Sequence, residues 1–308
     1  MVIMLEYISV NYEISFDEPI HWNICPSIVF RSVLGMQLHA LCCVLKDQPS
    51  CNSCPVSNTC VYAWFFETHI SKDSPSLEGR DRAPHPFVME YTDIDGAHGS
   101  LLITYMGRGS NFIPYVEEAL RRAGERGVTR DRVPYVIDAI SCKGVPFVYD
   151  FQSIKGMSRI WPIENVPDCT TPLCIKFITP LRIKKDSKYQ DSIDLGMLLH
   201  AIQRRILTLE SLYGNNPAEC VLEDIPKNNV VGQEWVELPY YSSRQHSLMQ
   251  LGGVKGGIEV QGSVPGKLMG LLMAGEVFHV GKNVSFGLGQ IRIGKGGYVN
   301  DIEQKTTV

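Results

Sequence analysis

The sequence lacks a hydrophobic segment long enough to cross a membrane. Its longest apolar runs, Val61–Phe66 and Leu268–Ala274, are far shorter than the roughly 20 residues that a transmembrane helix needs. The N-terminal stretch MVIMLEYISVNYEISF also lacks the basic flank of a signal peptide, because it carries Glu6 and Glu13. We therefore expect a cytoplasmic protein with no membrane partner.

The sequence also lacks a surplus of positive charge. It has 29 Lys and Arg against 33 Asp and Glu, for a net charge of −4. This balance argues against a protein that coats nucleic acid over its whole surface, but it leaves room for a local basic groove. Basic residues cluster in Arg121–Arg132 and in Arg182–Lys188. Each cluster is either solvated surface or part of such a groove.

Two nucleotide-binding motifs are missing. No segment has the Walker pattern G-x-x-x-x-G-K-[ST], and the glycine-rich stretch of this chain lies near its end, where no dinucleotide-binding turn is expected. We expect the acidic pair Asp93 and Asp95 to lie in a turn, and the pair Glu117 and Glu118 to lie on the solvated surface of a helix. The sequence therefore gives no indication of a catalytic metal.

The order of predicted elements indicates an α+β protein made of two similar halves. Each half contains the order β-α-β-β-α-β, with one further strand left over in the first half, so we expect two tandem ferredoxin-like (RRM-like) domains. The predicted elements of the first half are strands Leu5–Ile14, Phe87–Tyr91, Ser100–Met106, Val133–Ile140 and Val145–Phe151, helix Ile28–Leu45, and helix Pro114–Ala123 capped by Asn111 and stopped by Gly124. Those of the second half are strands Leu173–Ile183, Glu234–Tyr241, Val254–Val264 and Val284–Ile293, and helices Ser192–Tyr213 and Pro265–Ala274, the latter with Pro265 in its first turn.

These elements predict the domain boundaries. The N-terminal domain spans 1–165 and contains a Cys-rich insert at about 42–67, followed by an exposed linker at Ser71–Pro86. The C-terminal domain spans 170–295, and 296–308 reads as a tail or the start of a linker.

Cysteine is plentiful and unevenly placed, since five of the ten cysteines fall within Cys42–Cys60. Cys51, Cys54 and Cys60 have a metal-binding spacing, and Cys43, or Cys42 in its place, supplies a fourth thiolate. Four thiolates suit a structural zinc ion or a 4Fe–4S cluster. The loop looks like the cluster loop of iron–sulfur DNA glycosylases, but its first gap is seven residues where that pattern has six. We favour zinc, and chance clustering is the alternative.

Glycine is concentrated at the other end of the chain, in Leu251–Ile293. Glycine weakens helices and strands, so this density needs a reason. A loop of bare N–H groups beside a lysine suits a phosphate backbone, and Gly281, Lys282, Gly287 and Gly289 form such a loop before the last predicted strand. The alternative is a set of tight turns between strands.

These residues resemble a known family. The segment His279–Gly289 (HVGKNVSFGLG) is similar to the glycine-rich loop G-h-G-x5-G-h-G of CRISPR precursor-RNA endoribonucleases of the RAMP superfamily, except that His279 replaces the first glycine. Further similar segments are Tyr240–Gln245, Leu251–Gly253, Leu271–Glu276, Phe30–Gly35 and the cysteine insert. The resemblance covers most of the chain and implies two ferredoxin-like domains.

The resemblance also implies where the catalytic histidine lies, since the family often places it in or just after the first helix. His39 occupies that position. Arg31, Gly35 and His39 are spaced to share one helical face, on which Gly35 would leave room for an RNA backbone. His39 could instead be a metal ligand next to Cys43, or a buried structural histidine.

Other residues complete the expected site. His279 and His246 are the alternatives to His39 as the catalytic group. Tyr241, Arg244 and Lys255 join Arg31 and the residues of the glycine-rich loop as expected RNA contacts, because aromatic and cationic side chains bind unpaired bases and phosphates.

The resemblance implies a metal-independent endoribonuclease that binds CRISPR repeat RNA and cleaves precursor crRNA by attack of the RNA 2′-OH. A second hypothesis is a non-catalytic RNA-binding RAMP subunit of a CRISPR interference complex. A third is a metal-containing DNA-binding protein, which the negative net charge disfavours. Expected partners besides the RNA are a CRISPR effector complex or a fused reverse transcriptase–integrase.

Overall fold

The computed structural model describes residues 5–48, 50–67, 83–147, 149–150, 154, 156–161, 166–214, 222–242 and 247–295. The chain divides into two compact units. Unit 1 comprises Met1–Trp161 and Thr208–Pro217, and unit 2 comprises Pro162–Leu207 and Ala218–Val308. Both are α+β, each with an antiparallel sheet. Within the described ranges, no helix combines the length and apolar character that a bilayer crossing requires.

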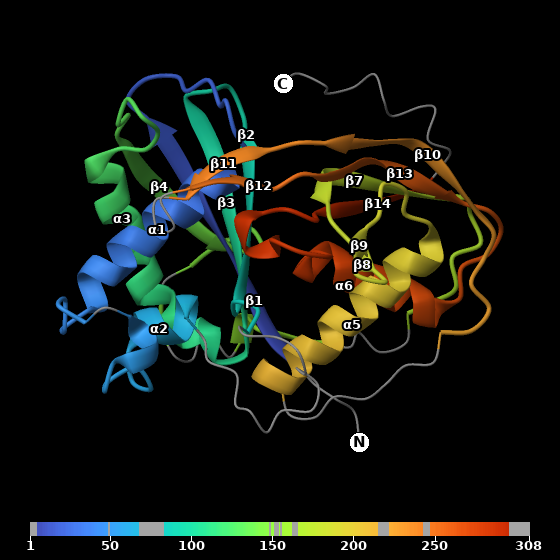
Figure 1. The fold of residues 1–308 in the computed structure, drawn as a ribbon, viewed down its shortest axis with the longest axis horizontal. Helices are drawn as coiled ribbons and strands as arrows, with labels where there is room; N and C mark the ends of the chain where they lie inside the picture. Colours follow the sequence, from blue (N-terminus) through green and yellow to red (C-terminus); the bar gives the residue numbers. More distant parts are fainter. Residues whose placement is uncertain are drawn as a thin grey trace. The chain divides into compact units, whose positions relative to one another are not determined.

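The sheet of unit 1 is built around its first strand (Figure 1). The strand order is β2-β3-β1-β4-β5, and β6 also pairs with β1. All of these pairings are antiparallel. The strands are β1 (Leu5–Phe16), β2 (Phe87–Asp93), β3 (His98–Met106), β4 (Tyr135–Cys142), β5 (Val145–Pro146) and β6 (Arg159–Trp161). Within the described residues, the predicted strand Val145–Phe151 is only the short β5, and the sequence did not predict β6.

Two helices cover one face of this sheet. They are α1 (Pro26–Cys42) and α3 (Ile113–Arg126), which lie side by side (Figure 1). Phe30, Leu34 and Leu38 of α1 form an apolar stripe at helical spacing and are completely buried in the core of the unit. A shorter helix, α2 (Val61–Phe66), packs against α1. The core is therefore the layer between the helices and the buried side of the sheet.

The ends of these helices differ from the prediction for identifiable reasons. Helix α1 stops at Cys42 and not at Leu45, because Cys43 is extended and the following Val44 is 78% exposed, with nothing to pack against. Helix α3 runs past Gly124 to Arg126. Gly124 serves close packing, since a Cβ there would lie 2.2 Å from the Tyr135 carbonyl oxygen.

Asn111 does not cap α3. It lies in a 3₁₀ turn, Gly107–Phe112, and the residue before the helix, Phe112, makes no side-chain capping hydrogen bond. The 3₁₀ turn leads directly into the helix, so no separate capping side chain is used.

Unit 2 has a four-stranded sheet in the order β10-β13-β7-β14 and two helices, α5 (Leu195–Tyr213) and α6 (Gly266–Phe278). Helix α5 continues into the segment that clusters with unit 1. Within each unit, the four principal strands follow the spatial order second, third, first, fourth. The sheet strands of unit 2 are β7 (Leu173–Leu181), β10 (Asn228–Val236), β13 (Gly253–Val260) and β14 (Ile291–Lys295).

Two short hairpins accompany this sheet. One is β8 (Lys184–Lys185) with β9 (Lys188–Tyr189), and the other is β11 (Pro239–Ser242) with β12 (Ser247–Gln250). The predicted strand Glu234–Tyr241 is therefore wrong, because it joins the end of β10 to the start of β11.

Two further predictions for unit 2 are wrong. The predicted strand Val284–Ile293 is a 3₁₀ turn, Val284–Phe286, followed by β14, because Gly287 and Gly289 have φ of +80° and +70° and interrupt an extended chain. Pro265 is the N-cap of α6 and not part of its first turn.

Several predicted features lie outside the described residues. They are most of the linker Ser71–Pro86, the tail 296–308, and Arg244 and His246.

Candidate functional site

His39 lies in the last turn of α1 and is half-buried. Its ring stands edge-on to the ring of Tyr62 on α2, with the ring centroids 4.7 Å apart and the planes at 80°. His39 thus lies in the first helix, the region in which the resemblance implied a catalytic histidine. Tyr62 was not predicted, because the contact joins two helices across the cysteine loop.

The rest of the predicted helical face is covered. An added Cβ at Gly35 would lie 3.3 Å from the Phe66 ring, and the guanidinium carbon of Arg31 lies 5.4 Å from the centre of that ring. The space next to Gly35 thus holds an aromatic ring of α2, and the prediction that it accommodates an RNA backbone is wrong. The aromatic side of α2 needs an apolar groove, and the missing side chain of Gly35 provides it.

Arg31 has a second contact that the sequence did not indicate. Its Nη2 atom lies 2.9 Å from Nε2 of His85, and the His85 ring stacks on Phe87 with a centroid separation of 5.6 Å. Arg31 and His85 are 54 positions apart, so no local pattern could have paired them. In this arrangement the Arg31 guanidinium contributes to the packing of unit 1.

The predicted metal ligands gather between α1 and α2. Cys43 follows α1 and Cys60 precedes α2, while Cys51 begins a 3₁₀ turn, Cys51–Ser53, that Cys54 follows; all four are half-buried. Burial, and then the nearby Cys60 and Cys43 thiols, raise the pKa of Cys42 to about 11.

Cys51 shows the same influence. Burial raises the pKa of Cys51, and Glu67 and Cys60 add to the effect. The thiols therefore lie within electrostatic range of one another. Across the described ranges, however, no three His, Cys, Asp or Glu side chains are arranged closely enough to hold a metal ion.

The glycine-rich loop is tied to the end of β7. The N–H of Lys282 donates to the Arg182 carbonyl at 3.0 Å, and the N–H of Gly289 donates to the Pro180 carbonyl at 3.1 Å. Within the loop, Val280 N–H donates to Gly289 and Gly287 N–H donates to Val284. Most of these groups are therefore not bare, and the alternative of tight turns describes the backbone better.

The glycines of the loop are needed for close backbone contacts. A Cβ at Gly289 would lie 1.9 Å from the Val280 carbonyl oxygen, and one at Gly281 would lie 2.5 Å from the Arg182 carbonyl oxygen. Both residues also have positive φ. The loop is thus a rigid support that fixes where Lys282 lies.

His279 is the residue that replaces a glycine of the family pattern, and it has φ of +57°. Its side chain is 1% exposed, and its Nδ1 lies 3.2 Å from the Leu288 carbonyl oxygen. In this arrangement the ring lies inside unit 2, and it would reach RNA only if the loop moved.

A cationic cluster surrounds Tyr189 in unit 2. The guanidinium carbon of Arg182 lies 4.0 Å from the centre of the Tyr189 ring, and Nζ of Lys282 lies 5.8 Å from it. Nζ of Lys184 lies 6.0 Å from the same ring, which is 42% exposed. Trp235 joins the group, 6.4 Å from Tyr189 between ring centroids. We call Arg182, Lys184, Tyr189, Trp235 and Lys282 the Tyr189 cluster.

The Tyr189 cluster unites two features that the sequence showed separately, the Arg182–Lys188 segment and the lysine of the glycine-rich loop. Its charge is also partly uncompensated. Nη1 of Arg182 donates to the Gln250 carbonyl at 2.9 Å, while its buried Nε has no hydrogen-bond partner within the described structure.

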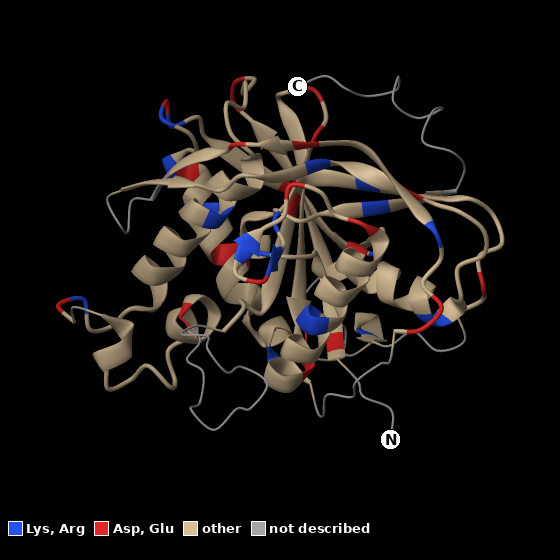
Figure 2. Ribbon diagram, turned by 45° about the vertical axis from the view of Figure 1, so that its right-hand side comes forward, with Lys and Arg blue, Asp and Glu red and all other residues tan. Residues whose placement is uncertain are grey.

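The other basic residues are less concentrated (Figure 2). Arg121 and Arg122 pair with Glu117 and Glu118 one turn earlier on α3, so that cluster is in part neutralised. Lys255 on β13 is exposed and lies opposite Glu234 of β10. Tyr241 lies in β11, where it pairs with Leu248.

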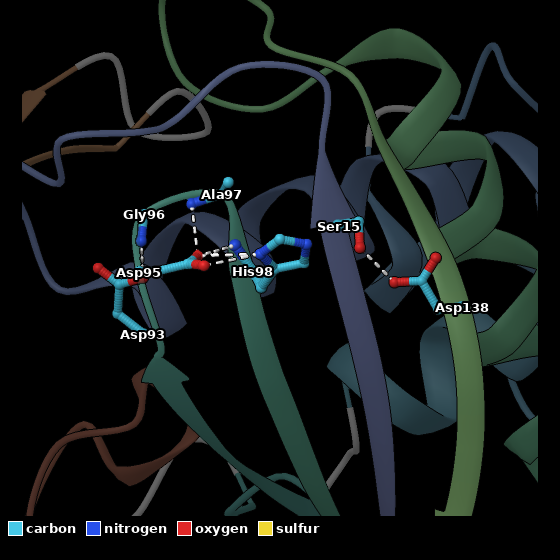
Figure 3. A network of polar contacts seen from close by, with 7 residues as sticks. All are labelled: Ser15, Asp93, Asp95, Gly96, Ala97, His98 and Asp138. Atoms are coloured by element: carbon cyan, nitrogen blue, oxygen red, sulfur yellow. Dashed lines mark hydrogen bonds and ion pairs between the residues drawn. The ribbon is translucent and has the colours of Figure 1, made fainter.

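Asp93 ends β2, and Asp95 lies in the turn that follows, close to the turn that the sequence predicts for this pair (Figure 3). Asp95 accepts hydrogen bonds from the backbone of Ala97 and His98 and lies 2.9 Å from the His98 ring, which lowers its pKa. Asp93 accepts one from Gly96. These carboxylates hold the β2–β3 turn.

Comparison with known proteins gives two family matches. Residues 5–155 match a model described as an N-terminal domain, and residues 175–291 match the model of CRISPR-associated endoribonuclease Cas6. No curated protein sequence gave a match.

Solved structures share the fold of the chain. A Cas6 product complex matches with a TM-score of 0.51 and 13% identity over 94% of this chain and 100% of that one. Cas6 of Thermus thermophilus gives 0.50 and 12%, over 95% and 99%. A chain of a partial Cas6-RT-Cas1–Cas2 complex gives 0.53 and 10%, over 99% of this chain and 48% of that one.

Proposed function

We infer that this chain is a CRISPR-associated endoribonuclease of the Cas6 family, which processes precursor crRNA, because residues 175–291 match that family and the whole fold is that of Cas6 structures. On this premise we propose the finer points of its action. Each unit is a ferredoxin-like domain, which the β-α-β-β-α-β order and the strand order support. Unit 2 binds the RNA backbone, and His39 of unit 1 takes part in cleavage.

The Tyr189 cluster is the observation that carries RNA binding. It presents three cationic side chains and a partly exposed aromatic ring from two separate segments of unit 2, the stretch 182–189 and the glycine-rich loop. Cations neutralise phosphates, and an aromatic ring stacks with an unpaired base of any sequence. The glycine-rich loop contributes by holding Lys282 in place, which its hydrogen bonds to β7 support.

For cleavage, we propose metal-independent transfer within the RNA. A general base removes the proton of the 2′-OH, the 2′ oxygen forms a bond to the adjacent phosphorus, and the P–O5′ bond breaks as a general acid protonates the leaving oxygen. The first product is a 2′,3′-cyclic phosphate with a free 5′-OH. Histidine suits either proton-transfer role near neutral pH, and the position of His39 in the final turn of α1 supports it as one of the two groups.

This mechanism is tested with labelled repeat RNA in the presence of EDTA. We expect cleavage to continue and to give a 2′,3′-cyclic phosphate or 3′-phosphate end. A substrate with a single 2′-deoxy nucleotide at the cut should stay intact, because it lacks the attacking oxygen. Cleavage of that substrate would show that an external nucleophile is used.

Lys282 gives a direct test of the Tyr189 cluster. Lys282→Ala should weaken the binding of RNA of any sequence and reduce the slope of log affinity against log salt by about 0.7–0.9, the value for one lost phosphate contact. Lys267→Ala, which removes an exposed lysine of α6, is the matched control. Equal slopes in the two variants would place the phosphate contact elsewhere.

We also propose that Cys43 (or Cys42), Cys51, Cys54 and Cys60 hold a structural zinc ion, with a 4Fe–4S cluster as the alternative. Their position between α1 and α2 supports this, as does the raising of the pKa of Cys42 and Cys51 by burial and by neighbouring thiols. The side chains would have to move closer, because they are not arranged as a metal site in this structure.

Elemental analysis of the purified protein should give about one zinc ion per chain, lost in Cys54→Ser. Absorbance near 400 nm would favour the iron–sulfur cluster instead. If freshly purified protein contains neither zinc nor iron, the proposal that these cysteines hold a metal is wrong.

The RNA partner follows from the function. We further propose a reverse transcriptase–integrase as a second partner, which the likeness to a chain of the Cas6-RT-Cas1–Cas2 complex supports. Co-purification of the two proteins tests it.

A further inference from the structure

A cavity of about 410 Å³ opens on the sheet of unit 1 and takes no part in the cleavage proposed above. Asn11 and Glu13 of β1, Ser141 of β4, Lys143 and Arg159 are among the residues that line it. The volume is within the usual range of small-molecule sites, roughly 300–1,000 Å³. Its lining combines polar and charged side chains with apolar ones, which suits a ligand that forms hydrogen bonds and also has an apolar face.

The cavity follows from the alternation of β1. Val10, Tyr12 and Ile14 are buried in the helix-side core, so Asn11 and Glu13 project from the other face of the sheet. Strand β6 pairs with β1 and brings Arg159 to the same face. Lys143 comes from the turn between β4 and β5, where it has φ of +53°.

The groups around the cavity differ in what they offer. Glu13 is an acceptor and carries a negative charge. Oδ1 of Asn11 already accepts a hydrogen bond from Ser100, so the amide nitrogen of Asn11 is the group left to donate. Lys143 and Arg159 both lie near Cys142, another residue of the lining. Burial raises the pKa of Cys142, and the positive charges of Lys143 and Arg159 act to lower it.

A matching ligand therefore needs adjacent donors for Glu13, a neighbouring acceptor for Asn11 and an anionic group for the two cations. Guanine has this edge, because its N1–H and N2–H₂ donors stand beside the O6 acceptor. Adenine, cytosine and uracil lack two adjacent donors there. Met157 in the wall supplies an apolar contact for the base, and a phosphate would complete the charge pairing.

We propose that this cavity binds a guanine nucleotide through Asn11 and Glu13, with its phosphate on Lys143 and Arg159. The ligand is either a free nucleotide or an unpaired guanosine of bound RNA, and the second form rests on the proposed function. In that form the cavity reads one base of the repeat at a place separate from the Tyr189 cluster.

Calorimetry with GMP, IMP and AMP tests the base recognition. GMP should bind about tenfold or more tightly than AMP, and IMP, which lacks the 2-amino group, should fall between them. Glu13→Gln should remove the preference for GMP, whereas Glu125→Gln, the same change at an exposed position of α3, should keep it. No measurable GMP binding at millimolar concentration, or equal binding of GMP and AMP, overturns the proposal.

Arg159→Gln provides a second variant with a different signature. It should weaken GMP and leave guanosine unchanged, because only GMP has the phosphate. Circular dichroism and thermal unfolding of each variant check that unit 1 remains folded. If Arg159→Gln lowers the affinity for GMP and guanosine equally, the phosphate is not where we place it.

Two short RNAs, UUUUGUUU and UUUUAUUU, identify the source of the ligand. Tighter binding of the first, lost in Glu13→Gln, shows that the cavity reads a guanosine of RNA. Binding of GMP without that RNA preference shows a free nucleotide. If the wild type prefers neither GMP over AMP nor UUUUGUUU over UUUUAUUU but still cuts repeat RNA, the cavity assignment alone is wrong. Failure of the wild type to cut repeat RNA would instead count against the proposed function.

Discussion

Replacing His39 with alanine is expected to lower the rate of RNA cleavage by roughly 10²- to 10⁴-fold, the usual contribution of a general acid or base. RNA affinity should change little, because the Tyr189 cluster, which we propose binds the RNA backbone, is built from unit 2. The rate should fall because alanine cannot carry out the proton transfer that we propose for His39. The His39 side chain is available for this role because it is only half-buried at the end of α1 and packs edge-on against Tyr62. Single-turnover rates at saturating RNA measure the effect without interference from product release.

The control for this change is His21→Ala, which removes an exposed histidine outside the helices of unit 1. Metal content and thermal stability of His39→Ala should also be measured, because His39 is four residues from Cys43. Loss of activity together with loss of metal would point to a structural role for His39. Unchanged cleavage would exclude His39 as the catalytic group. His279, or His246 outside the described residues, would then be the next candidate to replace.

Replacing Gly289 with alanine should destabilise unit 2 by at least about 2 kcal/mol, since an alanine at positive φ costs roughly 1–2 kcal/mol before any clash. Here the added Cβ would also lie 1.9 Å from the Val280 carbonyl oxygen, at φ of +70°. The hydrogen bond from Gly289 N–H to Pro180 would be strained as the loop shifts. Because the loop supports Lys282, we expect RNA affinity to fall as well.

Gly262→Ala separates the two causes. Gly262 has φ of +78°, but an added Cβ there meets nothing within 4 Å. It should therefore show the conformational cost without the clash, and RNA affinity should stay close to that of the wild type. Chemical denaturation of both variants gives the comparison. Equal destabilisation would mean that backbone conformation, and not close packing, accounts for the glycine at 289.

The first helix, α1, shows which features the local spacing of apolar residues can predict. The spacing of Phe30, Leu34 and Leu38 predicts the helix and its buried face, because periodicity depends only on neighbours along the chain. It could not predict that the Phe66 ring fills the space at Gly35. The aromatic residues of α2 lie beyond the cysteine loop, and only folding brings them against α1.

The glycine-rich end shows the same division. Its glycine content indicates an unusual backbone, which the positive φ of Gly281, Gly287 and Gly289 confirms. The motif resemblance agrees with the match of residues 175–291 to the Cas6 model. Whether the N–H groups of the glycine-rich end face a ligand or the protein depends on β7, about a hundred residues earlier in the chain, and the hydrogen bonds to Pro180 and Arg182 decide it. The burial of His279 also depends on the folded loop, because its ring contacts the carbonyl oxygen of Leu288 on the other side of the loop.

The sequence by itself determined the order of most elements, the split into two α+β halves and the resemblance to the Cas6 family, because these depend on apolar spacing and on motifs that are local in the chain. Only the tertiary structure decided which side chains meet: Tyr62 with His39, Arg182 and Lys282 around Tyr189, and Arg159 beside the polar face of β1. Most of these contacts join residues that are far apart in the chain, and their geometry is set by how strands pair and helices pack. The glycine-rich loop therefore carries the resemblance to the Cas6 family, while the Tyr189 cluster locates the proposed RNA contact.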